Sequence, residues 1–145
     1  MICVEPIDPA ALLASFSESQ RAAGAIVSFA GTVRGGEVEA LELEHHPSFT
    51  ARVIERIADD ARARFDIADC LVVHRVGRLL PGEPIVFVAA ASAHRRAAFE
   101  AVDYLMDRLK TEAPLWKREH RVDGAAWIEA RASDVADRAR WEIGR

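Results

Sequence analysis

The sequence has few cysteines and no long hydrophobic run. Its 145 residues include only Cys3 and Cys70 and no CxxC pair, so we expect neither a disulfide framework nor a thiolate metal site. No hydrophobic stretch approaches the ~20 residues that a membrane-spanning helix needs, and the first residues lack the basic and apolar segments of a secretory signal. The sequence therefore predicts a cytoplasmic protein without a membrane segment.

The charge balance also excludes a class of partner. The chain has 19 basic and 23 acidic side chains and a formal net charge of −4. A protein that coats nucleic acid needs a net basic face, so no nucleic-acid partner is expected. The length is that of one ordinary domain, and with 50% hydrophobic residues the chain can form a core without a disulfide or a structural metal.

Lysine is scarce as well. Among the 19 basic residues only Lys110 and Lys117 are lysines, and the others are arginines. A general bias toward arginine explains the surplus but leaves these two lysines in place, seven residues apart. Arginine keeps its proton at every working pH, whereas lysine can become a neutral amine. Any amine chemistry of this chain therefore depends on Lys110 and Lys117.

Hydrophobic periodicity and turn residues predict three helices and three pairs of strands. The helices are expected to begin at Asp8-Pro9, at Ser48 and at Ser92, the last one running to Lys110 before Pro114 stops it. The strands are expected at 24–34 with 38–46, at 70–79 with 84–91, and at 115–122 with 125–130. The pairs are joined by Gly35-Gly36, Pro81-Gly82-Glu83 and Asp123-Gly124, so each is expected to be a hairpin. This order predicts a single α+β domain with mostly antiparallel sheet.

Two basic segments are candidate anion sites. Ser92-Ala93-His94-Arg95-Arg96 places a hydroxyl, an imidazole and two guanidinium groups on the first turn of the long helix. Cations there oppose the helix dipole, so the pattern favours a bound anion held by the free N–H groups and the arginines. The alternative is that the cations point into water. Arg34, at a strand end beside two glycines, is a similar but weaker candidate.

The usual metal and nucleophile patterns are missing. His45 and His46 are neighbours on a predicted strand and point to opposite faces, and the other histidines are isolated. Neither cysteine lies beside a base or at a helix start, so a cysteine nucleophile is not expected. The glycines of 31–36 lack both the Walker lysine and the dinucleotide spacing. No metal and no cofactor are therefore expected.

The two lysines flank a helix end and a proline break. On the strand that follows, Lys117, Glu119 and Arg121 are expected to face one way, and Arg118 the other. One interpretation is a solvated, charged edge. The other is that the proline-fixed corner brings both lysines together in a cationic pocket.

Several strings, in one order, resemble the catalytic subunit of molybdopterin synthase. They include GAIVSFAGTVR, HRVGRLLPGE, SAHR, LKTEAPLWKRE and WIEAR, over about residues 24–131. The resemblance implies an α+β domain of the α/β-hammerhead type. We expect one domain over 1–131 with 132–145 as a tail; residues 1–23 and the tail match the family only weakly. The resemblance also implies a homodimer that binds a small ubiquitin-like sulfur-carrier subunit, giving a heterotetramer. In this family the C-terminal Gly-Gly thiocarboxylate of the small subunit gives sulfur, twice, to cyclic pyranopterin monophosphate, which forms the dithiolene of molybdopterin.

The resemblance also assigns site residues. Two of them, Lys110 and Lys117, match the active-site lysines of the family, and which lysine has which role stays open. The others match substrate-binding positions and are Arg34, His94, Arg95, Arg118 and Glu119. The turn after Arg34 is shorter than is usual in the family. The alternative function is a non-catalytic dimeric α+β module that binds an anionic metabolite.

One geometric consequence follows from the predicted long helix. His94 and Lys110 are 16 residues apart, which is about 24 Å along a helix axis. A single small substrate that contacts both must therefore lie between the helix start of one subunit and the helix end of another, as a twofold dimer allows. The alternative is that His94 only caps its helix and the site lies within one chain.

Overall fold

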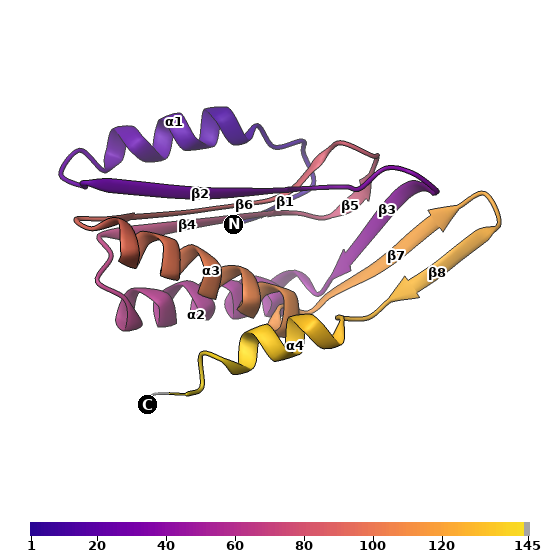
Figure 1. Cartoon of the computed structure of the whole chain (residues 1–145). Helices are drawn as coiled ribbons and strands as arrows, with labels where there is room; N and C mark the ends of the chain where they lie inside the picture. Colours follow the sequence, from indigo (N-terminus) through magenta and orange to yellow (C-terminus); the bar gives the residue numbers. More distant parts are fainter. Residues whose placement is uncertain (144–145) are drawn as a thin grey trace.

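The computed structural model describes residues 1–143, which form four helices and two four-stranded sheets (Figure 1). In chain order the elements are β1 (Ile2–Cys3), α1 (Pro9–Ser19), β2 (Ala25–Thr32), β3 (Val38–His45), α2 (Pro47–Arg64), β4 (Asp69–Arg75), β5 (Gly77–Leu79), β6 (Pro84–Ser92), α3 (Arg95–Glu112), β7 (Leu115–Arg121), β8 (Gly124–Ile128) and α4 (Ala132–Ala139). All strand pairs are antiparallel except β1 with β4. The predicted α+β class with mostly antiparallel sheet is confirmed.

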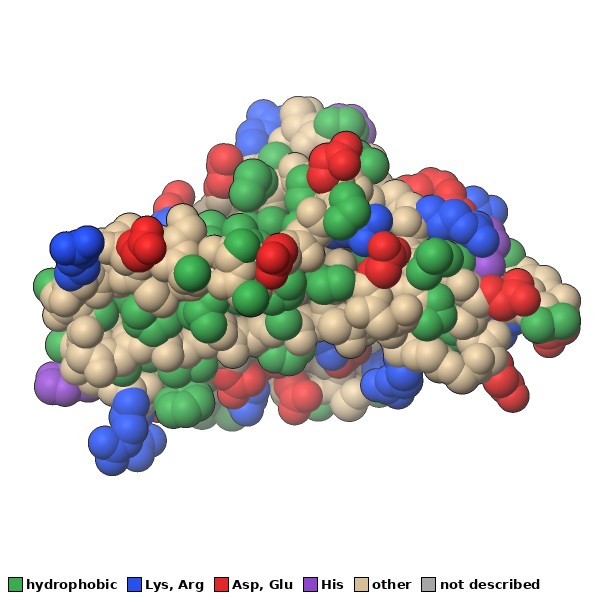
Figure 2. Space-filling view, turned by 90° about the horizontal axis from the view of Figure 1, so that it is seen from above, with side chains coloured by type: hydrophobic (Ala, Val, Ile, Leu, Met, Phe, Trp, Pro, Cys, Tyr) green, Lys and Arg blue, Asp and Glu red, His purple; other side chains and the backbone are tan. Residues whose placement is uncertain are grey.

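The first sheet has the order β1-β4-β6-β2 and lies between helices. Successive residues of its central strand β6 pack on opposite faces: Val88 contacts the core under α2 and α3, and Phe87 contacts the core under α1. Figure 1 shows α1 alone on one face and α2 with α3 on the other. Seen from the α1 side, hydrophobic side chains remain visible between charged ones (Figure 2).

The second sheet, β5-β3-β7-β8, extends from the end of the first. A core cluster of Val33, Leu41, Leu43, Val76 and Leu79 joins the two sheets. The predicted strand 70–79 is divided between them, because Gly77 adopts a φ of +91° that turns the chain from β4 into β5.

Two of the three predicted hairpin pairings are confirmed. β4 pairs with β6, and β7 pairs with β8 across the Asp123-Gly124 turn. The predicted hairpin of 24–34 with 38–46 is wrong: β2 pairs with β6, and β3 pairs with β5 and β7 in the other sheet. After β2 the backbone of Val33 bonds with Gly82 and Glu83 instead, which directs the chain across to the second sheet.

The helix starts are confirmed in part. Asp8 caps α1 by accepting from the N–H groups of Ala10 and Ala11 at 3.0 and 3.2 Å. Ser92, in contrast, does not cap α3. It is fully buried at the end of β6, where its Oγ donates to the carbonyl of Asp66 at 2.7 Å, and the helix begins at Arg95 with His94 as N-cap.

The C-terminal segment forms a helix that the sequence reasoning did not predict. α4 packs against α3 close to the end of that helix, as Figure 1 shows. Within residues 1–143 no helix is long and apolar enough to cross a membrane.

Candidate active site

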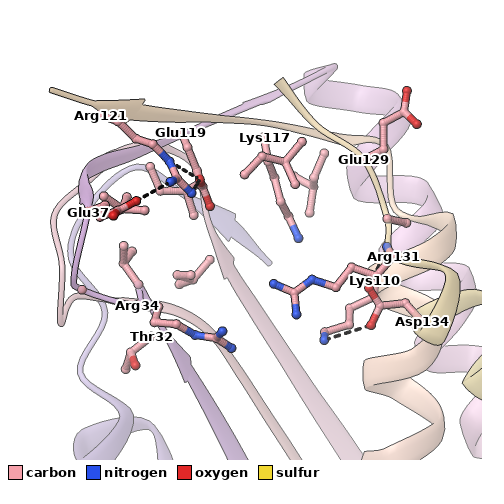
Figure 3. A pocket seen from close by; sticks show the side chains of 18 residues that line it. Thr32, Arg34, Glu37, Lys110, Lys117, Glu119, Arg121, Glu129, Arg131 and Asp134 are labelled. Carbon is pink, nitrogen blue, oxygen red and sulfur yellow. Dashed lines mark hydrogen bonds and ion pairs between the residues drawn. The ribbon is translucent and has the colours of Figure 1, made fainter. Parts of the chain in front are cut away.

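A cavity of about 480 Å³ lies where the second sheet meets the end of α3 and the start of α4 (Figure 3). Its walls come from the end of β2, the inner face of β7 and the segment between β8 and α4. The basic side chains around it are Arg34, Lys110, Lys117, Arg121 and Arg131, and the acidic ones are Glu37, Glu119, Glu129 and Asp134. The two lysines therefore share one pocket rather than lying along a solvated edge.

A second cavity, of about 420 Å³, adjoins the first. The two have in common Thr32, Arg34, Ile85, Lys110, Leu115 and Lys117. The second cavity is otherwise mostly apolar, with walls from Phe29, Gly31, Val86, Met106, Leu109 and Ala113. Lys110, Lys117 and Arg34 thus stand at the boundary between a charged chamber and an apolar one.

The two lysines have different surroundings. Lys117 is half-buried on the inner face of β7, and burial lowers the pKa of its amine below the usual range. The positive charge of Lys110 lowers this pKa further, while Asp134 acts in the opposite direction. Lys110, near the end of α3, is exposed, and its Nζ donates to Asp134 Oδ1 at 3.3 Å.

The acids of the charged chamber balance only part of its positive charge. Arg121 is paired with Glu119 at 2.7 Å and with Glu37 at 3.1 Å, and Lys110 is paired with Asp134. Across residues 1–143, no acidic partner lies within ion-pair distance of Arg34, Lys117 or Arg131. These three side chains point into the cavity in Figure 3. The chamber is therefore suited to a small anion.

A buried histidine lines the apolar chamber. Burial lowers the pKa of His74 to about 4, and the positive charge of Lys117 contributes in the same direction. Its Nδ1 lies 2.9 Å from the carbonyl oxygen of Arg75 and donates to it, which leaves Nε2 without the proton in the neutral ring. His74 is therefore neutral at physiological pH.

The structure does not bring every predicted residue to this cavity. Glu119 lines it, paired with Arg121. Arg118 lies on the opposite face of β7, where it pairs with Glu42 at 3.5 Å and its guanidinium stacks 4.7 Å from the Trp127 ring centre. This agrees with the alternation predicted for the strand.

His94 and Arg95 lie at the far end of α3. They are exposed and line a separate cavity of about 610 Å³ that shares no residue with the other two. About 24 Å of helix α3 separates His94 from Lys110. Within one chain the two ends cannot contact the same small substrate.

Neither cysteine lines the two adjoining cavities. Cys70 is buried, and burial raises the pKa of its thiol to about 11, so it is not a ready nucleophile. No group of three histidine, cysteine or acidic side chains within residues 1–143 could hold a metal ion.

Comparison with known proteins gives the family. The model of the family described as MoaE protein matches residues 2–112. A molybdopterin synthase catalytic subunit from Caulobacter vibrioides is 49% identical over 140 residues, which are 95% of this chain and 93% of that protein. The chain belongs to the family of molybdopterin synthase catalytic subunits. It is therefore an enzyme subunit of molybdenum cofactor biosynthesis.

Solved structures of this family have the same fold. The MoaE protein of Burkholderia ambifaria has a TM-score of 0.85 and 44% identity, with 98% of this chain and 96% of that chain covered. Molybdopterin synthase from Staphylococcus aureus has a TM-score of 0.79 and 31% identity, with 88% and 94% covered. The resemblance seen in the sequence is confirmed, and a non-catalytic binding module is not favoured.

Among the cavity residues that the sequence did not assign to the site are Arg131 and Asp134. Arg131 ends the segment between β8 and α4, and Asp134 lies in the first turn of α4, within 132–145, which was expected to be a tail. The available signal was an acidic residue three positions after Arg131, because an acid in the first turn is typical of a helix start.

Proposed function

We propose that this chain transfers sulfur from the C-terminal thiocarboxylate of a small ubiquitin-like subunit to cyclic pyranopterin monophosphate. The observation that supports this most directly is that Lys110, Lys117 and Arg34 stand together at the boundary of two adjoining chambers. The reaction needs an outside sulfur source, an anion site and an amine. The cavity offers the last two, and the buried Cys70 is no sulfur donor of its own.

The two chambers suit the two reactants. An extended Gly-Gly end has no side chains, so it needs little width, and the chamber near Phe29 and Met106 would receive it. The phosphate and the polar pterin fit the charged chamber, where Arg34 and Arg131 have no acidic partner within residues 1–143. The thiocarboxylate would then meet the pterin beside the two lysines.

The lysines are assigned different roles. Lys117 has the lowered pKa and is the amine that accepts a proton, whereas Lys110 is the ammonium that stabilises negative charge on the acyl oxygen. In each transfer the thiocarboxylate sulfur forms a bond to a side-chain carbon of the pterin, and a carbon–oxygen bond at that carbon breaks, with the oxygen leaving as water or as a phosphate oxygen. Water then attacks the acyl carbon and the acyl carbon–sulfur bond breaks. The sulfur stays on the pterin, the small subunit leaves as a carboxylate, and Lys117 takes up the proton that the water releases.

The assembly follows from the distance along α3. We propose a homodimer in which His94 and Arg95 of one subunit complete the lysine cavity of the other, giving a heterotetramer with two small subunits. Glu119 and its partner Arg121 would form the outer wall of the cavity. The two unpaired thiols, Cys3 and Cys70, fit a reducing cytoplasm as the compartment.

Reconstitution tests this function. The purified chain, a thiocarboxylated small subunit and cyclic pyranopterin monophosphate are mixed, and the pterin products are identified by mass spectrometry. We expect a dithiolene product that carries two sulfur atoms, together with small subunit converted to its carboxylate form. The matched control is the same small subunit with an ordinary carboxylate, which should give no product. Sulfur-free pterin in both mixtures would refute the proposal.

A further inference from the structure

Helix α4 is fixed on α3 around the turn that carries Lys110. Asp107, which is only 8% exposed, accepts from Arg140 Nη2 and from Trp141 Nε1, both at 2.7 Å. Glu112 accepts from Arg138 Nε at 2.7 Å. Lys110 lies between these two acids in the sequence of α3, so the last turn of α4 and the two residues after it are held to α3 on both sides of Lys110.

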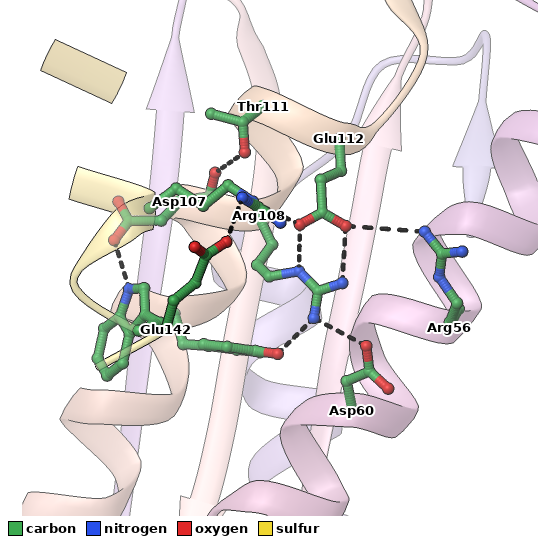
Figure 4. Close-up of polar contacts among 10 residues, drawn as sticks. Arg56, Asp60, Asp107, Arg108, Thr111, Glu112 and Glu142 are labelled. Atoms are coloured by element: carbon green, nitrogen blue, oxygen red, sulfur yellow. Dashed lines mark hydrogen bonds and ion pairs between the residues drawn. The ribbon is translucent and has the colours of Figure 1, made fainter. Parts of the chain in front are cut away.

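The acid Glu112 is itself held rigidly. Arg108 donates to both of its carboxylate oxygens at 2.6 Å and also to Asp60 on α2 at 2.8 Å (Figure 4). Tyr104 accepts from the same guanidinium. This network joins α2 and α3 to Arg138 in the last turn of α4. Because α4 has only eight residues, fixing its last turn on α3 also places its first turn, which carries Asp134, beside the cavity.

Asp134, in the first turn of α4, uses its two oxygens for different purposes. Its Oδ2 accepts from the backbone N–H of Arg131 at 3.1 Å, which fixes the side chain at the helix start. Its Oδ1 accepts from Lys110 Nζ at 3.3 Å. The Asp134 side chain is 17% exposed and that of Lys110 is 49% exposed, so the more buried carboxylate holds the more exposed ammonium group.

We propose that Asp134 is a positioning residue of the sulfur-transfer site: it holds Lys110 at the cavity as an ammonium ion, and α4 is the element that places it there. This inference rests on the proposed function and refines it. No other polar contact fixes Lys110 within residues 1–143, and a lysine side chain without a partner samples many rotamers. The pair keeps the ammonium within the region where the acyl oxygen would gain charge.

The charge of Asp134 also acts on Lys117. Although burial acts to raise it, the pKa of the Asp134 carboxyl is lowered by the hydrogen bond from Arg131 and then by Lys110, so it is ionised at neutral pH. Its negative charge opposes the effect of Lys110 on the amine of Lys117. Removing that charge while keeping Lys110 should therefore lower the pKa of Lys117 further.

Asp134→Asn tests the proposal, because asparagine keeps an oxygen for the Arg131 N–H but loses the charge. We expect kcat for sulfur transfer to fall roughly tenfold, with KM for the pterin within about twofold, since positioning rather than binding is lost. Asp134→Glu should restore most of kcat. The matched control is Asp137→Asn, which removes an exposed carboxylate from the same helix and should keep wild-type kcat.

A second readout needs no substrate. The chain has only two lysines, so labelling with [ε-¹³C]lysine gives two signals, and Lys117→Arg identifies which is which. We expect the titration midpoint of Lys117 to fall in Asp134→Asn and to stay unchanged in Asp137→Asn. An unchanged midpoint or an unchanged kcat in Asp134→Asn, with the helix content intact by circular dichroism, would overturn the positioning role. A shifted midpoint in a protein whose wild type makes no dithiolene would support the position of Asp134 and refute sulfur transfer instead.

Discussion

The placement of α4 should depend strongly on Trp141. The indole packs edge-to-face on Phe65 and Tyr104, with ring centres 5.8 and 5.5 Å away, and donates to Asp107 at 2.7 Å. We therefore expect Trp141→Ala to release α4 from α3 and, with it, Asp134 from Lys110.

The size of the effect follows from these contacts. Each aromatic pair contributes about 1 kcal/mol and a hydrogen bond to a carboxylate about 1.5 to 3 kcal/mol. Because such values are not additive, we expect the free energy that holds α4 in place to fall by about 3 kcal/mol. A change of that size raises the fraction of open molecules roughly 100-fold. Trp141→Phe keeps a ring and loses the N–H donor, so its effect should be roughly tenfold.

Hydrogen exchange measured by mass spectrometry checks this prediction. Peptides from 132–139 should exchange much faster in Trp141→Ala than in the wild type, and peptides from the centre of α3 should not change. Equal protection of 132–139 in both proteins would show that α4 is held by other contacts. The dependence of α4 on Trp141 would then be refuted.

Two further predictions concern the lysines and the dimer. In Lys110→Ala, the loss of a nearby positive charge should raise the pKa of Lys117. The single remaining lysine should therefore titrate at a higher pH than Lys117 does in the wild type. An equal or lower titration midpoint would contradict the electrostatic coupling between the two lysines. When Lys110→Ala subunits are combined with subunits that carry both His94→Ala and Arg95→Ala, the purified mixed dimer should regain about half of the wild-type activity, because one of its two sites is intact. Mixed dimers as inactive as the parent variants would place the whole site within one chain.

Much of the fold was predictable because helix starts, tight turns and strand alternation are determined by residues that are close together in the sequence. The Asp8-Pro9 helix start and the Asp123-Gly124 turn depend on residues close in sequence, and both have the expected structure. The alternation of β7 likewise placed Lys117 on the cavity face and Arg118 on the other.

The predictions that were wrong, and the contacts that were not predicted, depend on residues that are distant in the sequence. An alternating pattern in β2 identifies a strand but does not choose its partner, and the partner is β6 rather than the next strand. Ser92 has the chemistry of a helix cap, but its hydroxyl bonds with the carbonyl of Asp66, which lies far from it in sequence. The pair of Lys110 with Asp134 spans 24 positions and exists only because α4 folds back onto α3.

A comparison of arginine and lysine at one position tests most directly whether an amine in this cavity carries out the chemistry. In Lys117→Arg the positive charge remains, but the side chain can no longer accept a proton. With thiocarboxylated small subunit and cyclic pyranopterin monophosphate, we expect this variant to form dithiolene roughly 100-fold more slowly than the wild type, or slower still. Arg52→Lys, an exposed exchange on α2, serves as the control and should keep the wild-type rate. A near-normal rate for Lys117→Arg would contradict the role of the amine and leave only electrostatic stabilisation.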